Sequence, residues 1–186
     1  VNAKCIELKY PKIMNEIINS ALSHDFDSVL IFTWSDWHSE PRSNRYHYAK
    51  RFAEELPVLF FQSHKMKKIS MPIKTEITDI NNLEIVNINQ NKTESDIRDV
   101  LDLLKSRGIN KPLIWIYDTI NYNNLIDAFP NAFKAYHATE LYLEKVDTSG
   151  ASIKPDNEVA NSVKNILKTV DLVIACSNGV ADSILR

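Results

Sequence analysis

Short, unbroken runs of apolar residues recur along the chain and are separated by segments of helical periodicity. The clearest runs occupy residues 29–34, 57–62, 112–117 and 171–176. A continuous apolar run of this length is typical of a strand that is buried on both faces, as in a parallel sheet. Weaker runs at 73–77, 83–88 and 132–137 predict further strands.

Between these runs, apolar residues recur at the three- and four-residue spacing of one helix face. The spacing predicts helices at 11–22, 45–56, 94–107 and 123–129, another from 156 onward, and a last one after 179. Thr93 is suited to the N-cap of the third helix, and Gly108 to its end. The alternation predicts an α/β fold with a Rossmann-like, doubly wound and mainly parallel sheet that carries helices on both faces.

The 186 residues fit a single domain of this kind, with residues 1–26 as a helical extension at the N-terminus. Both ends of the chain suggest a fragment of a longer protein. It begins with Val1 rather than Met, and it stops at Arg186 soon after a new helix begins. We therefore expect a further domain to follow in the parent protein.

Composition and charge narrow the classes of partner. The net charge of -2 lacks the positive footprint of a nucleic-acid binder, so no nucleic-acid partner is predicted. No apolar run approaches the roughly 20 residues that span a bilayer, and no signal peptide precedes the first strand. The basic and apolar segment 65–69 leaves open a peripheral contact with an anionic membrane surface, although charge runs of this size are usually only solvated.

The cysteines and histidines point away from disulfides and metals. Cys5 and Cys176 are the only cysteines, and Cys176 falls in the run 171–176, which predicts that it is buried in a strand. A reducing, cytoplasmic location therefore fits best. The five histidines show no metal-ligand spacing, and no cysteine lies near them, so no metal site is predicted.

Ligands of doubly wound folds bind beyond the carboxyl ends of the strands, so the loops that follow the strands are the first places to search. The loop after 29–34 contains no glycine, and the whole chain has only three. Dinucleotide-binding domains and P-loops need glycines there so that the backbone can approach phosphates. We therefore predict no bound NAD or FAD and no other resident cofactor, which also disfavours a reductase.

The same loop is rich in groups that bind ligands. Trp37 offers a flat face for a sugar ring or a lipid chain, and Asp36 and Glu40 can accept hydrogen bonds from hydroxyl groups. His38 in the same loop is also predicted to bind substrate. Arg42 and Arg45 can hold a phosphate beside the start of the next helix. The alternative is a solvated loop whose tryptophan packs on a neighbour.

Two later strand ends add candidates. Asp118 and Asn121 follow the run 112–117 and are predicted to bind substrate, with ordinary turn and capping chemistry as the alternative. His137 and Glu140 follow the strand at 132–137. They are predicted to be catalytic, as a base and its orienting carboxylate, or to bind hydroxyl groups of an acceptor. The alternative for His137 is a histidine bonded to a backbone carbonyl under a surface loop.

Several of these segments together resemble a known family. The run 29–37, Arg45 with the helix through Ala49, and the run 58–61 are similar to the opening of bacterial GT-B glycosyltransferases of the large retaining class. The run 112–117 resembles the strand that those proteins place before the acceptor cleft. Residues 170–177 and 180–185 resemble the segment that closes their N-terminal domain, and Ser177 within it is predicted to contact substrate. His137 and Glu140 stand where relatives often have aspartates.

The resemblance implies a division of labour between two domains. This chain would bind a saccharide or lipid-linked acceptor, and a C-terminal domain beyond Arg186 would bind the nucleotide-sugar donor. Catalysis would take place in the cleft between them, and the isolated chain would be inactive. The alternative interpretation is a non-catalytic α/β domain that binds a ligand or has a regulatory role.

Overall fold

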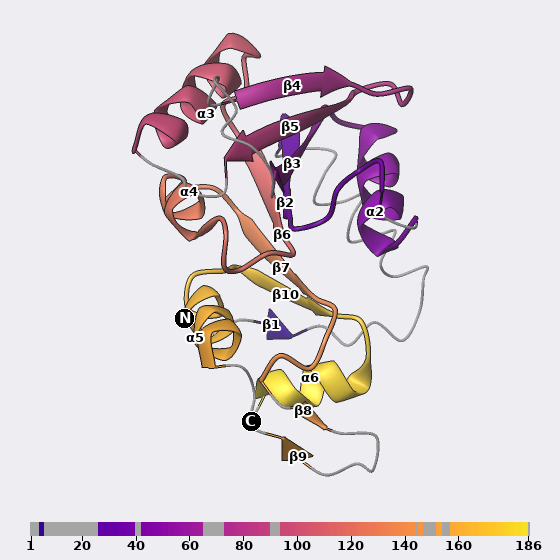
Figure 1. The fold of residues 1–186 in the computed structure, drawn as a ribbon, viewed down its shortest axis with the longest axis vertical. Coiled ribbons are helices and arrows are strands. Elements are labelled where there is room, and N and C mark those ends of the chain that lie inside the picture. The colour runs from indigo at the N-terminus through magenta and orange to yellow at the C-terminus, as the bar shows by residue number, and fades with distance from the viewer. Residues whose placement is uncertain are drawn as a thin grey trace.

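The computed structural model describes residues 4–5, 26–39, 42–64, 73–89, 94–143, 145–146, 152–153 and 157–185 (Figure 1). The helix predicted at 11–22, the N-cap predicted at Thr93 and the basic segment 65–69 lie outside these residues. Everything below concerns the part of the chain that is described.

The centre of the fold is an eight-stranded sheet with the order β1-β10-β7-β6-β2-β3-β5-β4. All pairings are parallel except that of β4 with β5. The strands are β1 (Lys4–Cys5), β2 (Ser28–Thr33), β3 (Val58–His64), β4 (Ile73–Ile77), β5 (Leu83–Asn89), β6 (Pro112–Ile116), β7 (Lys134–Ala138) and β10 (Leu172–Ala175).

The strand order identifies the fold. When β2, β3, β5, β6, β7 and β10 are numbered along the chain as strands one to six, their order across the sheet is 3-2-1-4-5-6. This is the doubly wound order of the Rossmann fold. The fold class predicted from the alternation of strands and helices is therefore confirmed.

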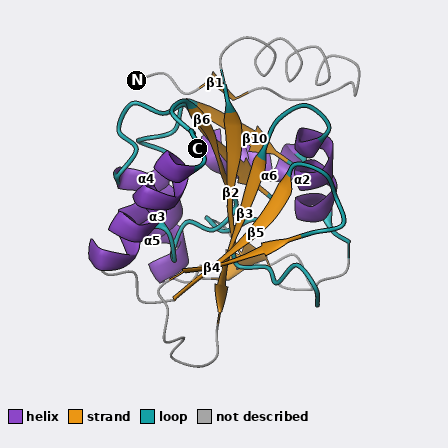
Figure 2. Ribbon diagram, turned by 90° about the horizontal axis from the view of Figure 1, so that it is seen from above, coloured by secondary structure: helices purple, strands orange, loops and turns teal. Residues whose placement is uncertain are grey.

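Helices cover both faces of the sheet (Figure 2). One apolar cluster lies between the sheet and helices α3, α4 and α5, and a second lies between the sheet and α2. The helices are α2 (Asn44–Ala53), α3 (Glu94–Ser106), α4 (Asn123–Asp127), α5 (Asn157–Ile166) and α6 (Asn178–Leu185).

Strand β2 shows why its sequence is an unbroken apolar run. Val29 and Ile31 belong to the cluster under α2, and Leu30 and Phe32 belong to the cluster under α3, α4 and α5. All four side chains are fully buried. Because successive residues of a strand point to opposite faces, a strand with helices on both sides must be apolar at every position.

Two expectations in the second half of the chain are corrected. The segment 144–155, in which no strand was predicted, contains a short antiparallel pair, β8 (Lys145–Val146) with β9 (Ser152–Ile153). Cys176 was predicted to be buried, but β10 ends at Ala175 and Cys176 is exposed. The Cys176 thiol donates to the carbonyl oxygen of Thr139 at 3.0 Å, outside the core.

Helix α3 is followed by a glycine whose backbone lies in the left-handed region, which other residues rarely adopt. Gly108 has a φ of 71° and follows the helix, and the N–H of Ile109 donates to the carbonyl of Leu104 at 3.0 Å. A Cβ at Gly108 would meet nothing within 4 Å, so a side chain would cost backbone strain alone. We expect Gly108→Ala to lower the free energy of unfolding by about 1 kcal/mol in urea titrations.

Gly179 is the matched control, because it lies in α6 and its φ is not in the left-handed region. Gly179→Ala is expected to stabilise the helix by up to about 1 kcal/mol. Equal losses from both substitutions would contradict this reading of the α3 terminus.

Candidate functional site

A crevice lies at the point where the strand order of the sheet reverses. Strands β2 and β6 are neighbours in the sheet, but the chain continues from β2 to β3 on one side and from β6 to β7 on the other. The two loops that follow these strands therefore diverge, and they leave a crevice between them at the carboxyl ends of the strands. A hollow of about 210 Å³ opens there. It is lined by Trp34, Tyr117, Asp118, Thr119, Ile120, Asn121, Tyr142 and Val159.

Trp34 is the most exposed aromatic side chain at this crevice, with 37% of its surface accessible. The guanidinium of Arg45 lies 4.3 Å from the centroid of the indole ring and 5.5 Å from that of Tyr117. Tyr142 meets the indole edge-on, with the ring centroids 6.5 Å apart and the planes at 89°. The rim of the crevice is therefore a cation–π and aromatic cluster from four different segments.

Helix α2 positions Arg45 at the crevice. Ser43 is the N-cap of this helix, and its hydroxyl accepts from the N–H of Arg45 at 3.3 Å. The cap fixes the direction in which the first turn leaves the loop. Arg45 is thereby directed toward the ends of β2 and β6.

Asp118 lies in the wall of the crevice. Its carboxylate is 2% exposed. Oδ1 accepts from the N–H groups of Ile120 and Asn121, both at 2.9 Å, and Oδ2 accepts from Nδ2 of Asn121 at 2.7 Å. These bonds match the turn chemistry that was the alternative interpretation of this loop. Asp118 shapes the crevice and is not placed to act as a base.

Helix α5 and strand β2 hold the same loop from two sides. The hydroxyl of Ser162 donates to the carbonyl of Thr119. The hydroxyl of Tyr122 donates to the carbonyl of Thr33 at 3.1 Å, and its ring stacks on Phe32 at 5.0 Å. Burial raises the pKa of Tyr122 well above its usual value, so this hydroxyl stays protonated. The crevice wall is rigidly attached to the sheet.

His137 lies behind the crevice and is 3% exposed. Its Nδ1 is 3.0 Å from the hydroxyl of Tyr117, and its ring packs against Tyr48 and Trp115. Burial, assisted by the positive charge of Arg45, lowers the pKa of His137 to about 4. The imidazole is therefore neutral near pH 7.

The pairing predicted between His137 and Glu140 is not formed. The hydrogen-bond partner of His137 is Tyr117, while Glu140 is exposed and its backbone carbonyl accepts from the N–H of Tyr142 at 2.9 Å. The strand ends at Ala138, and the chain then turns, so the spacing of three residues does not bring the two side chains together. His137 supports Tyr117 in the structure instead.

Trp37 lies away from the crevice and packs between α2 and the sheet. Its ring is 5.0 Å from both Tyr46 and Phe60. The backbone N–H of Trp37 donates to Oε1 of Gln62 at 2.7 Å, and Nε2 of Gln62 donates to Oδ1 of Asn87 at 2.8 Å. This is the packing role that was the alternative interpretation of Trp37.

The polar residues around Trp37 form local contacts. Oδ1 of Asp36 accepts from the N–H groups of His38 and Ser39. Partial burial raises the pKa of Asp36, but hydrogen bonds from Ser39 and His38 outweigh this effect and lower it overall. Nε2 of His38 lies 2.8 Å from Glu76 on the edge strand β4. Asp36 and His38 therefore shape the loop on the β4 side of the molecule.

The other two predicted site residues also make structural contacts. The guanidinium of Arg42 lies 4.9 Å from the ring centroid of Tyr46. The hydroxyl of Ser177 accepts from the N–H of Val180 at 3.3 Å and caps α6. Of the ten residues predicted from the sequence, the structure gathers four at or behind the crevice: Arg45, Asp118, Asn121 and His137.

Sequence reasoning missed three aromatic residues of the crevice: Trp34, Tyr117 and Tyr142. Trp34 and Tyr117 each end an apolar run, so they were counted with the buried strands. Their position at the carboxyl ends of the two strands that flank the reversal is the signal that could have found them.

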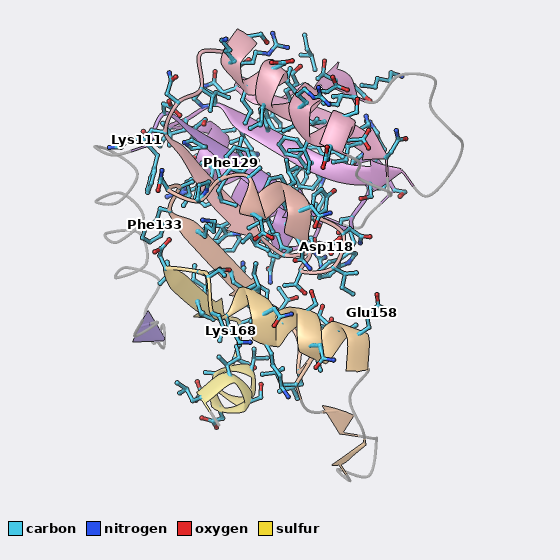
Figure 3. All side chains as sticks on the ribbon, turned by 90° about the vertical axis from the view of Figure 1, so that its left-hand side faces the viewer. Lys111, Asp118, Phe129, Phe133, Glu158 and Lys168 are labelled. Atoms are coloured by element: carbon cyan, nitrogen blue, oxygen red, sulfur yellow. The ribbon has the colours of Figure 1, made fainter. Side chains whose placement is uncertain are left out.

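Two larger hollows, of about 450 and 490 Å³, lie at the amino ends of the strands. Figure 3 places Lys111, Phe129 and Phe133, which line the larger one, on the opposite side of the molecule from Asp118. We prefer the smaller crevice as the site, because ligands of this fold bind at the carboxyl ends and because aromatic and polar groups converge there.

The described residues hold no group of three or more histidine, cysteine or acidic side chains that could bind a metal ion. Within the same part of the chain, no helix is long and apolar enough to cross a membrane. No protein-family model matches the chain, and a search of curated proteins gives no match. What the fold and the crevice define is thus a Rossmann-like α/β domain with a candidate ligand site at its switch point.

Proposed function

We propose that this chain is the acceptor-side domain of a GT-B glycosyltransferase, which transfers a sugar from a nucleotide-sugar donor to a saccharide or lipid-linked acceptor. The observation that carries the proposal is the crevice at the reversal of strand order, where Trp34 and Tyr142 stand beside the polar groups of Thr119 and Asn121. Aromatic faces complement the apolar faces of sugar rings, and the neighbouring polar groups select among hydroxyl patterns.

The loop after β2 supports the assignment of the donor to another domain. Residues 34–39 contain no glycine, and their N–H groups at Trp37, His38 and Ser39 already donate to Gln62 and Asp36. Backbone N–H groups are what a phosphate-binding loop must offer. In the proposed enzyme, a further domain binds the sugar nucleotide, and its closure over the crevice excludes water from the transfer reaction.

The intact gene product provides the test. We expect it to transfer sugar from UDP- or GDP-sugars to a panel of oligosaccharide and polyprenyl-linked acceptors, with product measured by mass spectrometry. Trp34→Ala is expected to lower kcat/KM by about tenfold, because it removes the ring platform of the crevice. Phe133→Ala is the matched control, because Phe133 is equally exposed, at 39%, but lies on the opposite side of the molecule.

A second candidate, a non-catalytic α/β domain that binds a ligand or has a regulatory role, is favoured by one observation. Around the crevice, the described residues do not include an assembled acid–base pair: Asp118 is engaged by three N–H donors, and Glu140 is not bonded to His137. Binding of acceptors by the intact gene product without any turnover of sugar nucleotides would favour this candidate.

A further inference from the structure

The size of the crevice limits what it can hold. At about 210 Å³ it is smaller than the roughly 300–1,000 Å³ of pockets for drug-sized ligands. A single six-membered ring with its substituents is a suitable occupant. Longer glycans or lipids would extend out of the crevice past Trp34 and Ile120, both of which are more than a third exposed.

The Trp34 ring is held from more than one side. Arg45 covers it at 4.3 Å, and Tyr142 meets it at a right angle. Arg45 is not among the residues that line the crevice, so a ligand reaches the indole from a side that Arg45 leaves open. A second cation at the same ring system would be repelled by the guanidinium already there.

The charged groups around the crevice are largely compensated. The carboxylate of Asp118 is engaged by three N–H donors, and Arg45 lies against two aromatic rings. His137, behind the crevice, is neutral near pH 7. Glu158, the neighbour in sequence of the lining residue Val159, is exposed, and Figure 3 shows it at the end of α5 nearer to Asp118, with Lys168 at the opposite end. The remaining lining offers the amide and hydroxyl groups of Asn121, Thr119 and Tyr142.

We propose that the crevice is a subsite for one uncharged sugar ring stacked on Trp34, and that Arg45 is the positioning residue that makes it selective against positively charged rings. This proposal rests on the proposed function and names the terminal unit of its acceptor. A carboxylated ring would lie against the carboxylate of Asp118, which lines the crevice, and an aminated ring would lie against the cation–π pair of Arg45 with Trp34. A neutral ring avoids both penalties.

The test uses the ¹⁵N-labelled chain and its three tryptophan indole N–H signals. The signal that disappears in Trp34→Phe belongs to Trp34. Methyl glucopyranoside is expected to shift this signal and to leave those of Trp37 and Trp115 in place. Methyl glucuronide and methyl glucosaminide are expected to bind about tenfold more weakly.

Arg45→Met separates positioning from general structure. Because it removes the charge but keeps an unbranched apolar side chain, it is expected to abolish the tenfold penalty on methyl glucosaminide and to weaken binding of the neutral glycoside severalfold. Arg45→Lys should keep part of the penalty. A penalty that is unchanged in Arg45→Met would overturn the role of Arg45, provided that the variant melts like the wild type.

The outcomes also distinguish this proposal from the proposed function. If the intact gene product transfers sugar and Trp34→Ala transfers equally well, the subsite is wrong and the function stands. If the neutral glycoside shifts the Trp34 signal but no transfer occurs, the subsite stands and the transferase function is wrong. A Trp34 signal that moves only with charged glycosides would overturn the subsite.

Discussion

Lowering the pH from 6.5 to 4 is expected to destabilise the folded chain by about 3 kcal/mol through His137 alone. The pKa of this buried imidazole is about 4 in the folded chain, against 6.5 for an ordinary histidine. Between these values the unfolded chain binds a proton that the folded chain excludes. The contribution of His137 to stability is therefore fully present above pH 6.5, and it is lost as the pH falls toward 4.

Urea unfolding at several pH values measures this effect. Wild type and His137→Phe are compared, so that the titration of carboxylates is common to both. The phenylalanine keeps an aromatic ring beside Tyr48 and Trp115 but cannot take up a proton. We expect the variant to lose about 3 kcal/mol less than the wild type between pH 6.5 and 4. The same slope in both proteins would contradict the burial of a neutral His137, and His47→Gln, at an exposed histidine, should leave the slope unchanged.

Asp118→Ala is expected to lower the free energy of unfolding by about 3 kcal/mol and to abolish ligand binding at the crevice. The substitution removes three hydrogen bonds at once and leaves the N–H groups of Ile120 and Asn121 without their acceptor in a partly buried turn. The loop that lines the crevice would then lose the turn that shapes it, because the bonds of Thr119 to Ser162 and of Tyr122 to Thr33 attach the loop to its neighbours but do not close the turn.

Asp118→Asn and Asp102→Ala are the matched variants. Asparagine keeps one side-chain oxygen, so it should keep the acceptor for the two backbone N–H groups and lose less stability than alanine. Asp102 is exposed on α3, and its replacement should change stability by less than about 0.5 kcal/mol. A loss from Asp118→Ala as small as that from Asp102→Ala would show that the turn does not depend on the carboxylate.

The fold could be predicted because its strands carry strong local signals. β2, β3 and β6 are buried on both faces, so each is an apolar run that no amphipathic element would show. The strand predicted at 73–77 matches β4 in both bounds, and the structure places it at the edge of the sheet. The hairpin of β8 and β9 was missed because strands of two residues are too short to show a period.

The site was harder to predict, because it depends on contacts between distant segments. Trp34 and Trp37 follow the same strand, and nothing local distinguishes them. Trp37 packs against Phe60 and Tyr46, which come from other segments of the chain. Trp34 instead lies partly exposed at the rim of the crevice, with Arg45 over its ring. The partner of His137 was also misjudged, because Tyr117 follows another strand, β6, and Glu140 was only close in sequence.

The division of labour between this chain and a donor-binding domain is the central claim, and backbone amide shifts of the chain test it most directly. Saccharide acceptors are expected to shift signals of residues 34, 117–121, 142 and 159, which line the crevice. UDP- and GDP-sugars are expected to bind weakly or not at all. Saturable, tight binding of a sugar nucleotide, or saccharide shifts confined to the hollow around Phe26 and Phe133 at the opposite edge, would contradict the account.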